Sequence, residues 1–184
     1  MTGGFARSAT GRVVLRVDEL EKGLLRSLAE QVLAFVSPDD SGPERDPLAI
    51  LIGIESDATK PDDPALARLF PDAYREDDEA ASDFRRFTER SLRETKMAHA
   101  QAVLDGLGRS GEKIVLSEQE TASWLGFLND ARLALGTRIE LSDDNQDELA
   151  DLPEEDPRSG MFQVYDYLTY LQDSLVQLLF EALG

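Results

Sequence analysis

Apolar residues recur at helical spacing along most of the chain, and one such stretch also carries a cluster of polar residues. The segment 124–140 reads W-L-G-F-L-N-D-A-R-L-A-L-G-T-R-I-E, with apolar positions at Trp124, Leu125, Leu128, Leu135 and Ile139. Its polar interruptions are Asn129, Asp130, Arg132 and Arg138. Because a buried charge without a partner is costly, we expect these four residues to form a network that docks neighbouring helices on a central helix.

The N-terminal part of the chain predicts a short β-hairpin followed by a helix. Apolar residues alternate over 12–17, and Gly11 separates this run from a second run at 5–8, which is typical of a hairpin turn. Asp18 and Glu21 have the spacing of a capping box. The helix that they open should bury Leu20, Leu24, Leu28, Val32 and Phe35.

Aspartate-proline pairs mark the start of two short helices in the middle of the chain. Asp46-Pro47 and Asp63-Pro64 each place a capping carboxylate before a proline, which predicts helices over 47–54 and 64–70. The run 48–54 could instead be a buried strand, since it is almost continuously apolar. The longest helical pattern covers 79–107, and its core candidates are Phe84, Phe87, Leu92, Ala98, Val103, Leu104 and Leu107.

The last third of the chain predicts one more strand and two long helices. The run 113–116 is typical of a short strand, and Ser117 with Glu120 forms a second capping box that opens the central helix. The segment 142–157 holds eight acidic and no basic residues, which predicts a mobile loop before a final helix from about Gly160. We therefore expect one mainly α domain over 1–184, a helical bundle with a small N-terminal β-hairpin.

The charge of the chain narrows the possible functions. It has 37 acidic and 19 basic residues and a net charge of -18, which repels the phosphates of nucleic acids and anionic lipids. A protein partner is therefore the better expectation. No cysteine is present, which excludes disulfides and thiolate chemistry in these residues. Since no apolar run is long enough for a membrane span or a signal peptide, we expect a cytoplasmic protein.

Three arginines form a candidate binding surface on the long helix. Arg86, Arg90 and Arg93 are spaced at i, i+4 and i+7, so they share one helical face that could receive an acidic peptide or a phosphate group. The alternative is that Glu89 and Glu94 neutralise them within the molecule.

The acidic segment is a candidate metal site. Asp143, Asn145, Asp147, Asp151 and Glu154 occupy positions one, three, five, nine and twelve of a calcium-loop template. Two residues depart from that template: Glu148 stands where a glycine is needed, and Pro153 stands where the next helix should begin. A solvated linker is the alternative interpretation.

Catalysis has little support in the sequence. His99 is the only histidine, and it would act as a base only with an orienting partner such as Asp130 in a deep pocket. Asn129 and Asp130 fit docking contacts with Arg132 or Arg138 better than an acid-base pair. The chain has no Gly-rich phosphate loop, nucleophile elbow or His-Glu metal motif, so we expect no enzyme and no cofactor.

Four phrases together resemble a known family. They are P-D-D-P-A-L-A-R-L-F-P-D-A-Y at 61–74, E-A-A-S-D-F-R-R-F-T-E at 79–89, L-R-E-T-K at 92–96 and W-L-G-F-L-N-D-A-R-L-A-L-G-T-R at 124–138. They are similar to an actinobacterial family of unknown function that includes an oxidation-sensing regulator of transcription. The resemblance implies a cytoplasmic protein that contacts an alternative sigma factor, and a sensing branch that oxidises a close pair of cysteines.

The absence of cysteine separates this chain from that sensing branch. Of the two properties that the resemblance implies, we therefore expect only the binding of a protein partner in this chain. We expect a non-enzymatic regulatory or adaptor protein that acts by protein-protein contact without thiol redox sensing, with Arg86, Arg90 and Arg93 as its contact surface. The alternative is a ligand- or metal-binding helical domain that uses the acidic segment 143–154.

Overall fold

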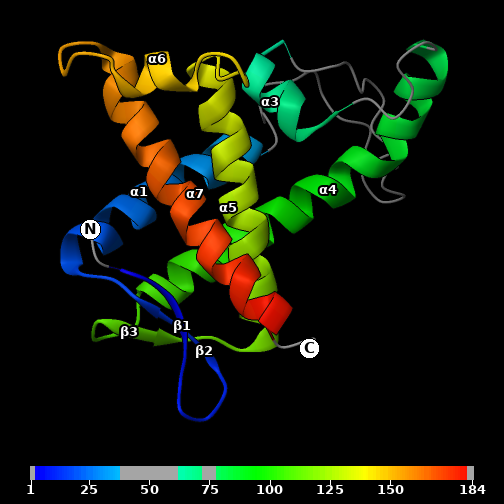
Figure 1. Cartoon of the computed structure of the whole chain (residues 1–184). Helices are drawn as coiled ribbons and strands as arrows, with labels where there is room; N and C mark the ends of the chain where they lie inside the picture. The colour runs from blue at the N-terminus through cyan, green and yellow to red at the C-terminus, as the bar shows by residue number, and fades with distance from the viewer. Residues whose placement is uncertain (1–2, 38–61, 72–77, 182–184) are drawn as a thin grey trace.

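A computed structural model of the chain describes residues 3–37, 62–71 and 78–181, and of 78–87 the backbone alone. Its elements are β1 (Gly4–Arg7), β2 (Val13–Arg16), α1 (Glu19–Val36), α3 (Pro64–Leu69), α4 (Asp78–Leu107), β3 (Lys113–Val115), α5 (Glu118–Arg138), α6 (Gln146–Ala150) and α7 (Pro157–Glu181) (Figure 1). The mainly α prediction is confirmed. The element expected over 47–54 lies outside the described residues. Within the described ranges, none of the helices has the length and apolar character that crossing a bilayer requires.

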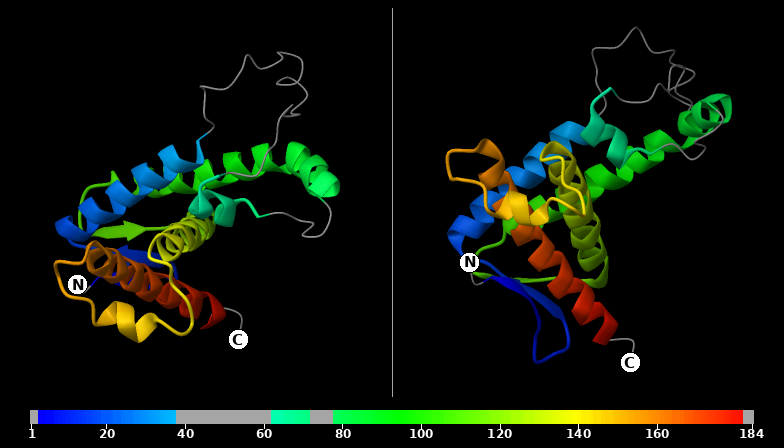
Figure 2. Two further views of the ribbon diagram at one scale, coloured as in Figure 1. Left: turned by 90° about the horizontal axis from the view of Figure 1, so that it is seen from above. Right: turned by 45° about the horizontal axis from the view of Figure 1, so that its top comes forward.

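Helix α5 is the centre of the fold, as the sequence predicts. It lies between the α1–α4 pair on one side and α7 on the other (Figure 2). Trp124, Phe127 and Leu128 are at most 1 % exposed. The Trp124 ring makes edge-to-face contacts with Phe5, at 5.8 Å between centroids, and with Phe127, at 6.2 Å. The Ser117–Glu120 capping box begins the helix, which confirms that prediction.

The N-terminal hairpin is part of a three-stranded antiparallel sheet in the order β1-β2-β3. Gly11 has a φ of +79° in the turn between β1 and β2, a conformation that favours glycine. Leu15 on β2 pairs with Ile114 on β3, and both side chains are fully buried. Strand β1 lies along α7, where the Phe5 N–H donates to the Ser174 hydroxyl. The sheet is thereby held on the helices.

The buried face of α1 is rotated relative to the prediction. The capping box of Asp18 and Glu21 is present, but Leu20 is 81 % exposed, so its expected burial was wrong. Val32 is buried as expected, and the other buried apolar residues of the helix are Leu25, Ala29 and Val36. In the first turn, the inward positions are occupied by the polar residues Glu21 and Lys22, both of which are buried. The Glu21 carboxylate accepts a hydrogen bond from the Gly3 N–H, and the Lys22 ammonium group donates one to the Gly111 carbonyl.

Helix α4 likewise departs from the predicted core positions. Val103 and Leu107 are buried as expected, whereas Leu92 is 38 % exposed and Ala98 is exposed. In the middle of the helix the inward positions are taken instead by Glu89, which is buried, and by Arg93 and Lys96, whose side chains are 14 % and 12 % exposed. The core of this region is therefore partly ionic.

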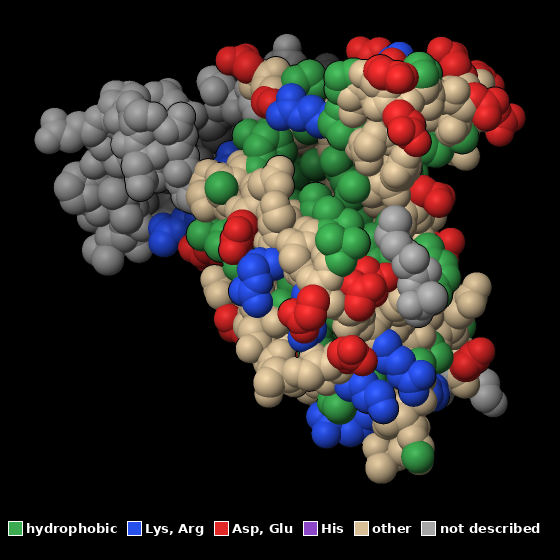
Figure 3. Space-filling view, turned by 90° about the vertical axis from the view of Figure 1, so that its left-hand side faces the viewer, with side chains coloured by type: hydrophobic (Ala, Val, Ile, Leu, Met, Phe, Trp, Pro, Cys, Tyr) green, Lys and Arg blue, Asp and Glu red, His purple; other side chains and the backbone are tan. Residues whose placement is uncertain are grey.

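The acidic segment 142–157 is a structured connection in which α6 occupies 146–150, so the loop expectation was wrong there. Leu149 is 3 % exposed, and α6 packs against α7. Helix α7 begins at Pro157, three residues before the expected Gly160. The Asp156 side chain, just before this start, accepts a hydrogen bond from the Arg158 N–H in the first turn. Figure 3 shows acidic side chains gathered at this end of the molecule and Lys and Arg side chains at the opposite end.

Candidate functional site

Three of the four polar residues predicted to form a network on α5 join three neighbouring helices, whereas Asn129 is exposed and has no side-chain hydrogen bond among the described residues. Asp130 accepts from the Lys96 ammonium group of α4 at 2.6 Å, and Arg138 donates to Asp63 at the start of α3 at 2.6 Å. The Arg132 guanidinium donates to three side chains of α7, which are Tyr165, Thr169 and Gln172. These are helix-docking contacts. The partner of Asp130 is Lys96, however, rather than Arg132 or Arg138, because those two face other helices.

The arginines of α4 do not form one free surface. Arg93 donates to the Glu89 carboxylate and to the Val36 carbonyl, and its guanidinium lies 4.4 Å from the Phe70 ring centroid. It therefore ties α4 to α1 and to the end of α3. Arg90 pairs with Glu94 at 3.0 Å, while the side chain of Arg86 lies outside the described part. Figure 3 also shows Lys and Arg side chains gathered at the end of the molecule that carries the sheet. Exposed basic residues of the sheet and its turn are Arg7, Arg12, Arg16 and Lys113.

The acidic residues do not assemble into the candidate calcium site. Asn145 uses its side chain within a turn, accepting from the Ser142 N–H and donating to the Glu140 carbonyl. Asp147 stands in the first turn of α6, so the segment does not wrap as a calcium loop. Among the described residues, no three His, Asp or Glu side chains are grouped to hold a metal ion.

His99 packs against α5 near Asp130 without joining it in an acid-base pair. The imidazole lies directly over Gly126, and its Nδ1 atom is buried with no hydrogen-bond partner among the residues that the structure describes. Burial lowers the pKa of His99, and the Asp130 carboxylate opposes that shift while Lys96 adds to it. Asp130 is bound to Lys96. The geometry thus favours a packing role for His99.

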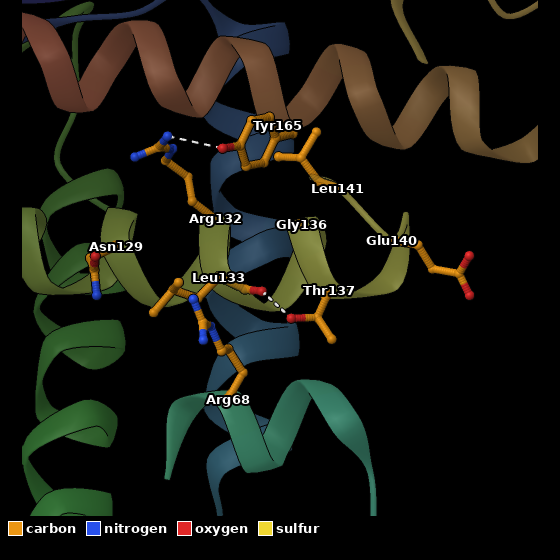
Figure 4. A pocket seen from close by; sticks show the side chains of 9 residues that line it. All are labelled: Arg68, Asn129, Arg132, Leu133, Gly136, Thr137, Glu140, Leu141 and Tyr165. Atoms are coloured by element: carbon orange, nitrogen blue, oxygen red, sulfur yellow. Dashed lines mark hydrogen bonds between the residues drawn. The ribbon is translucent and has the colours of Figure 1, made fainter. Parts of the chain in front are cut away.

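A pocket of about 570 Å³ opens over α5 between α3 and α7 (Figure 4). We call it the arginine pocket, because Arg68 of α3 and Arg132 of α5 line it together with Tyr165 of α7. Its other lining residues are Asn129, Leu133, Gly136, Thr137, Glu140 and Leu141. The Arg132 guanidinium lies 5.1 Å from the centroid of the Tyr165 ring. One rim of the pocket is therefore cationic and aromatic.

A second hollow of about 490 Å³ lies between α1 and α5. We call it the apolar groove; its lining residues are Leu28, Gln31, Val32, Ala34, Phe35, Ala131, Ala134, Leu135 and Arg138. The Arg138 guanidinium stands 5.6 Å from the centroid of the Phe35 ring. The α5 side of the groove presents two alanines, so another chain could approach the helix closely.

Sequence reasoning missed most residues of both hollows. Arg68 stands in a short helix with no unusual pattern around it, and nothing in the sequence links it to Arg132. Tyr165 lines the arginine pocket from α7. Leu28 and Phe35 were expected in the core, but they are half-buried in the apolar groove. The signal in the sequence was the apolar stripe predicted for α1, which contains both of these residues.

Fold and site together define an acidic, mainly helical protein in which α5 lines two surface hollows among the described residues. The chain belongs to the family described as a domain of unknown function, DUF2017, whose model matches residues 1–179. It is 34 % identical over 173 residues to proteins named oxidative stress regulator AosR from Mycobacterium tuberculosis and Mycobacterium bovis, across 86 % of this chain and 78 % of theirs. A putative AosR of Mycobacterium leprae is 34 % identical over 170 residues, across 85 % of this chain and 77 % of its own length. No solved structure matches the chain. These relatives support a regulatory role.

Proposed function

We propose that the chain is a non-enzymatic regulatory protein that acts by binding a protein partner in the apolar groove. The observation that carries this proposal is the groove itself, where Leu28 and Phe35 of α1 face Ala131 and Ala134 of α5. An apolar hollow on a strongly charged surface is typical of a protein-binding site, and a helix or an extended segment with apolar anchors would suit its size.

The partner should present basic residues around its apolar anchors. The net charge of -18 attracts a basic partner at long range and repels an acidic one. An alternative sigma factor is the partner that we favour, because the family resemblance implies one. Such contact would regulate transcription without direct contact between this chain and DNA.

The proposed role does not include thiol sensing by these residues. A disulfide switch needs two cysteines, and the 184 residues contain none. Arg86 and Arg90 stay in the proposal as a second contact surface. Arg93 is left out of it, because its guanidinium is already bound to Glu89 and Val36 within the domain.

A charge placed in the groove tests the proposal. Ala34 lines the groove and is exposed, so Ala34→Glu should leave the fold intact while putting a carboxylate among the apolar anchors of the partner. Ala122→Glu is the matched control, because Ala122 is an exposed helical alanine outside the lining. Binding of a panel of purified alternative sigma factors would be measured by biolayer interferometry for all three proteins.

The proposal predicts that one sigma factor binds the wild type and the Ala122→Glu variant alike, and binds the Ala34→Glu variant at least about tenfold more weakly. Equal binding by all three proteins would place the contact elsewhere, and the charge variant Arg90→Glu would then test α4. If no sigma factor binds the wild type, the choice of partner is wrong.

A further inference from the structure

We propose that the arginine pocket binds a small organic anion through a carboxylate or phosphate group held by Arg68 and Arg132. This inference is independent of the apolar groove, since the two hollows open on different faces of α5. The observation behind it is a local excess of positive charge in a strongly acidic chain.

Arg132 is half-buried, yet its hydrogen-bond acceptors are all neutral. They are the hydroxyls of Tyr165 and Thr169 and the amide oxygen of Gln172, at 3.1, 2.9 and 2.7 Å. A guanidinium has five N–H donors, so these three bonds leave two donors unused. Within the described ranges Arg132 forms no salt bridge, so no carboxylate of those residues neutralises its charge.

Arg68 supplies a second cation from the opposite wall. It is exposed, and its side chain has no hydrogen bond or ion pair in the described part of the chain. In Figure 4 the guanidinium groups of Arg68 and Arg132 lie toward the same end of the pocket as the Asn129 amide, whereas the Glu140 carboxylate points away at the other end. The end near Asn129 is therefore positive.

These groups define the class of ligand. Two arginines favour an oxyanion, which each can bind with paired N–H donors. The Tyr165 ring and Leu133 offer apolar surface for the rest of the molecule, and Asn129 offers an amide. A volume of about 570 Å³ is in the range of sites for small metabolites. The ligand class is thus a small metabolite with one anionic group.

The inference can be tested by titrating anions into the full chain and recording ¹H–¹⁵N NMR spectra at each step. The probes are inorganic phosphate and malonate, so that phosphate recognition can be separated from carboxylate recognition. Each probe is compared with sodium chloride at equal ionic strength, which controls for general charge screening. Arg68→Gln is the main variant, because Arg68 is exposed and holds no other residue. Arg12→Gln is the matched control, because it removes the same charge from an exposed position beside the hairpin turn, outside the pocket lining.

We expect at least one probe to shift the amide signals of 129–137 and the side-chain signals of Arg68 and Arg132 at millimolar concentration. Arg68→Gln should weaken that binding about tenfold or more, and Arg12→Gln should leave it unchanged. If neither probe moves these signals, the inference is overturned. It is also overturned if the two variants weaken binding equally, because the anions would then respond only to overall charge.

Discussion

Replacing Asp130 with leucine would leave the Lys96 ammonium group between α4 and α5 without its anion. The two side chains are 4 % and 12 % exposed, and their Nζ and Oδ1 atoms are 2.6 Å apart. Water therefore cannot take over the lost contact fully. Lys96→Met creates the converse defect, since it leaves the Asp130 carboxylate buried without a cation.

Burial sets the magnitude of these changes. Removal of one partner from a buried ion pair costs about 3–5 kcal/mol, because the remaining charge stays desolvated. Replacement of both partners by apolar residues of similar size is often close to neutral. We therefore expect each single variant to lose about 3 kcal/mol or more of unfolding free energy, and the double variant Lys96→Met/Asp130→Leu to lose only about 1 kcal/mol.

Urea unfolding monitored by tryptophan fluorescence would measure these losses. Trp124 is the only tryptophan and is fully buried, so its emission reports loss of the core around α5. Glu94→Gln is the control, because it breaks the exposed pair with Arg90 and should change the unfolding free energy by at most about 0.5 kcal/mol. The m value should remain constant across the series.

Additivity is the result that would refute this reasoning. If the double variant loses the sum of the two single losses within about 0.5 kcal/mol, Lys96 and Asp130 are not coupled. A loss for Asp130→Leu as small as that for Glu94→Gln would likewise mean that the pair is effectively solvated.

Three further predictions concern the core and its histidine. In urea unfolding, Leu25→Ala should lose about 3 kcal/mol, whereas Leu20→Ala, at an 81 % exposed position, should change the free energy by less than about 0.5 kcal/mol. Gly126→Ala should destabilise by about 1–3 kcal/mol because the new methyl group meets the His99 ring, whereas Gly23→Ala, which meets nothing within 4 Å, should stabilise by about 1 kcal/mol. Burial lowers the pKa of His99 in the folded chain below its ordinary value of 6.5. As the pH drops below about 6.5, the imidazole is therefore protonated more readily in the unfolded chain than in the folded one, and the unfolding free energy should fall. Urea midpoints across this pH range should show that His99→Gln removes this part of the fall, and an unchanged pH dependence in the variant would contradict it.

Local signals in the sequence determined where several elements begin. The capping boxes Asp18–Glu21 and Ser117–Glu120 and the Asp63-Pro64 pair all start helices as predicted, because their hydrogen bonds join residues at most three positions apart. The hairpin turn at Gly11 is equally local. The sequence also indicated the central position of α5, since its apolar positions recur at helical spacing around a cluster of polar residues that needs partners on neighbouring helices.

Only the tertiary structure decided which residues meet. Arg93 donates a hydrogen bond to the Val36 carbonyl, 57 positions away in the chain. Asp130 forms its ion pair with Lys96 of α4 rather than with an arginine on its own helix. The arginine pocket likewise brings together Arg68 of α3 and Arg132 of α5. No pattern in the sequence indicates that these two helices lie side by side. Helical periodicity reports which residues share a face, but the rotation and docking of each helix depend on the side chains packed against it. For that reason the sequence predicted the elements, while the two candidate binding sites emerged only from their packing.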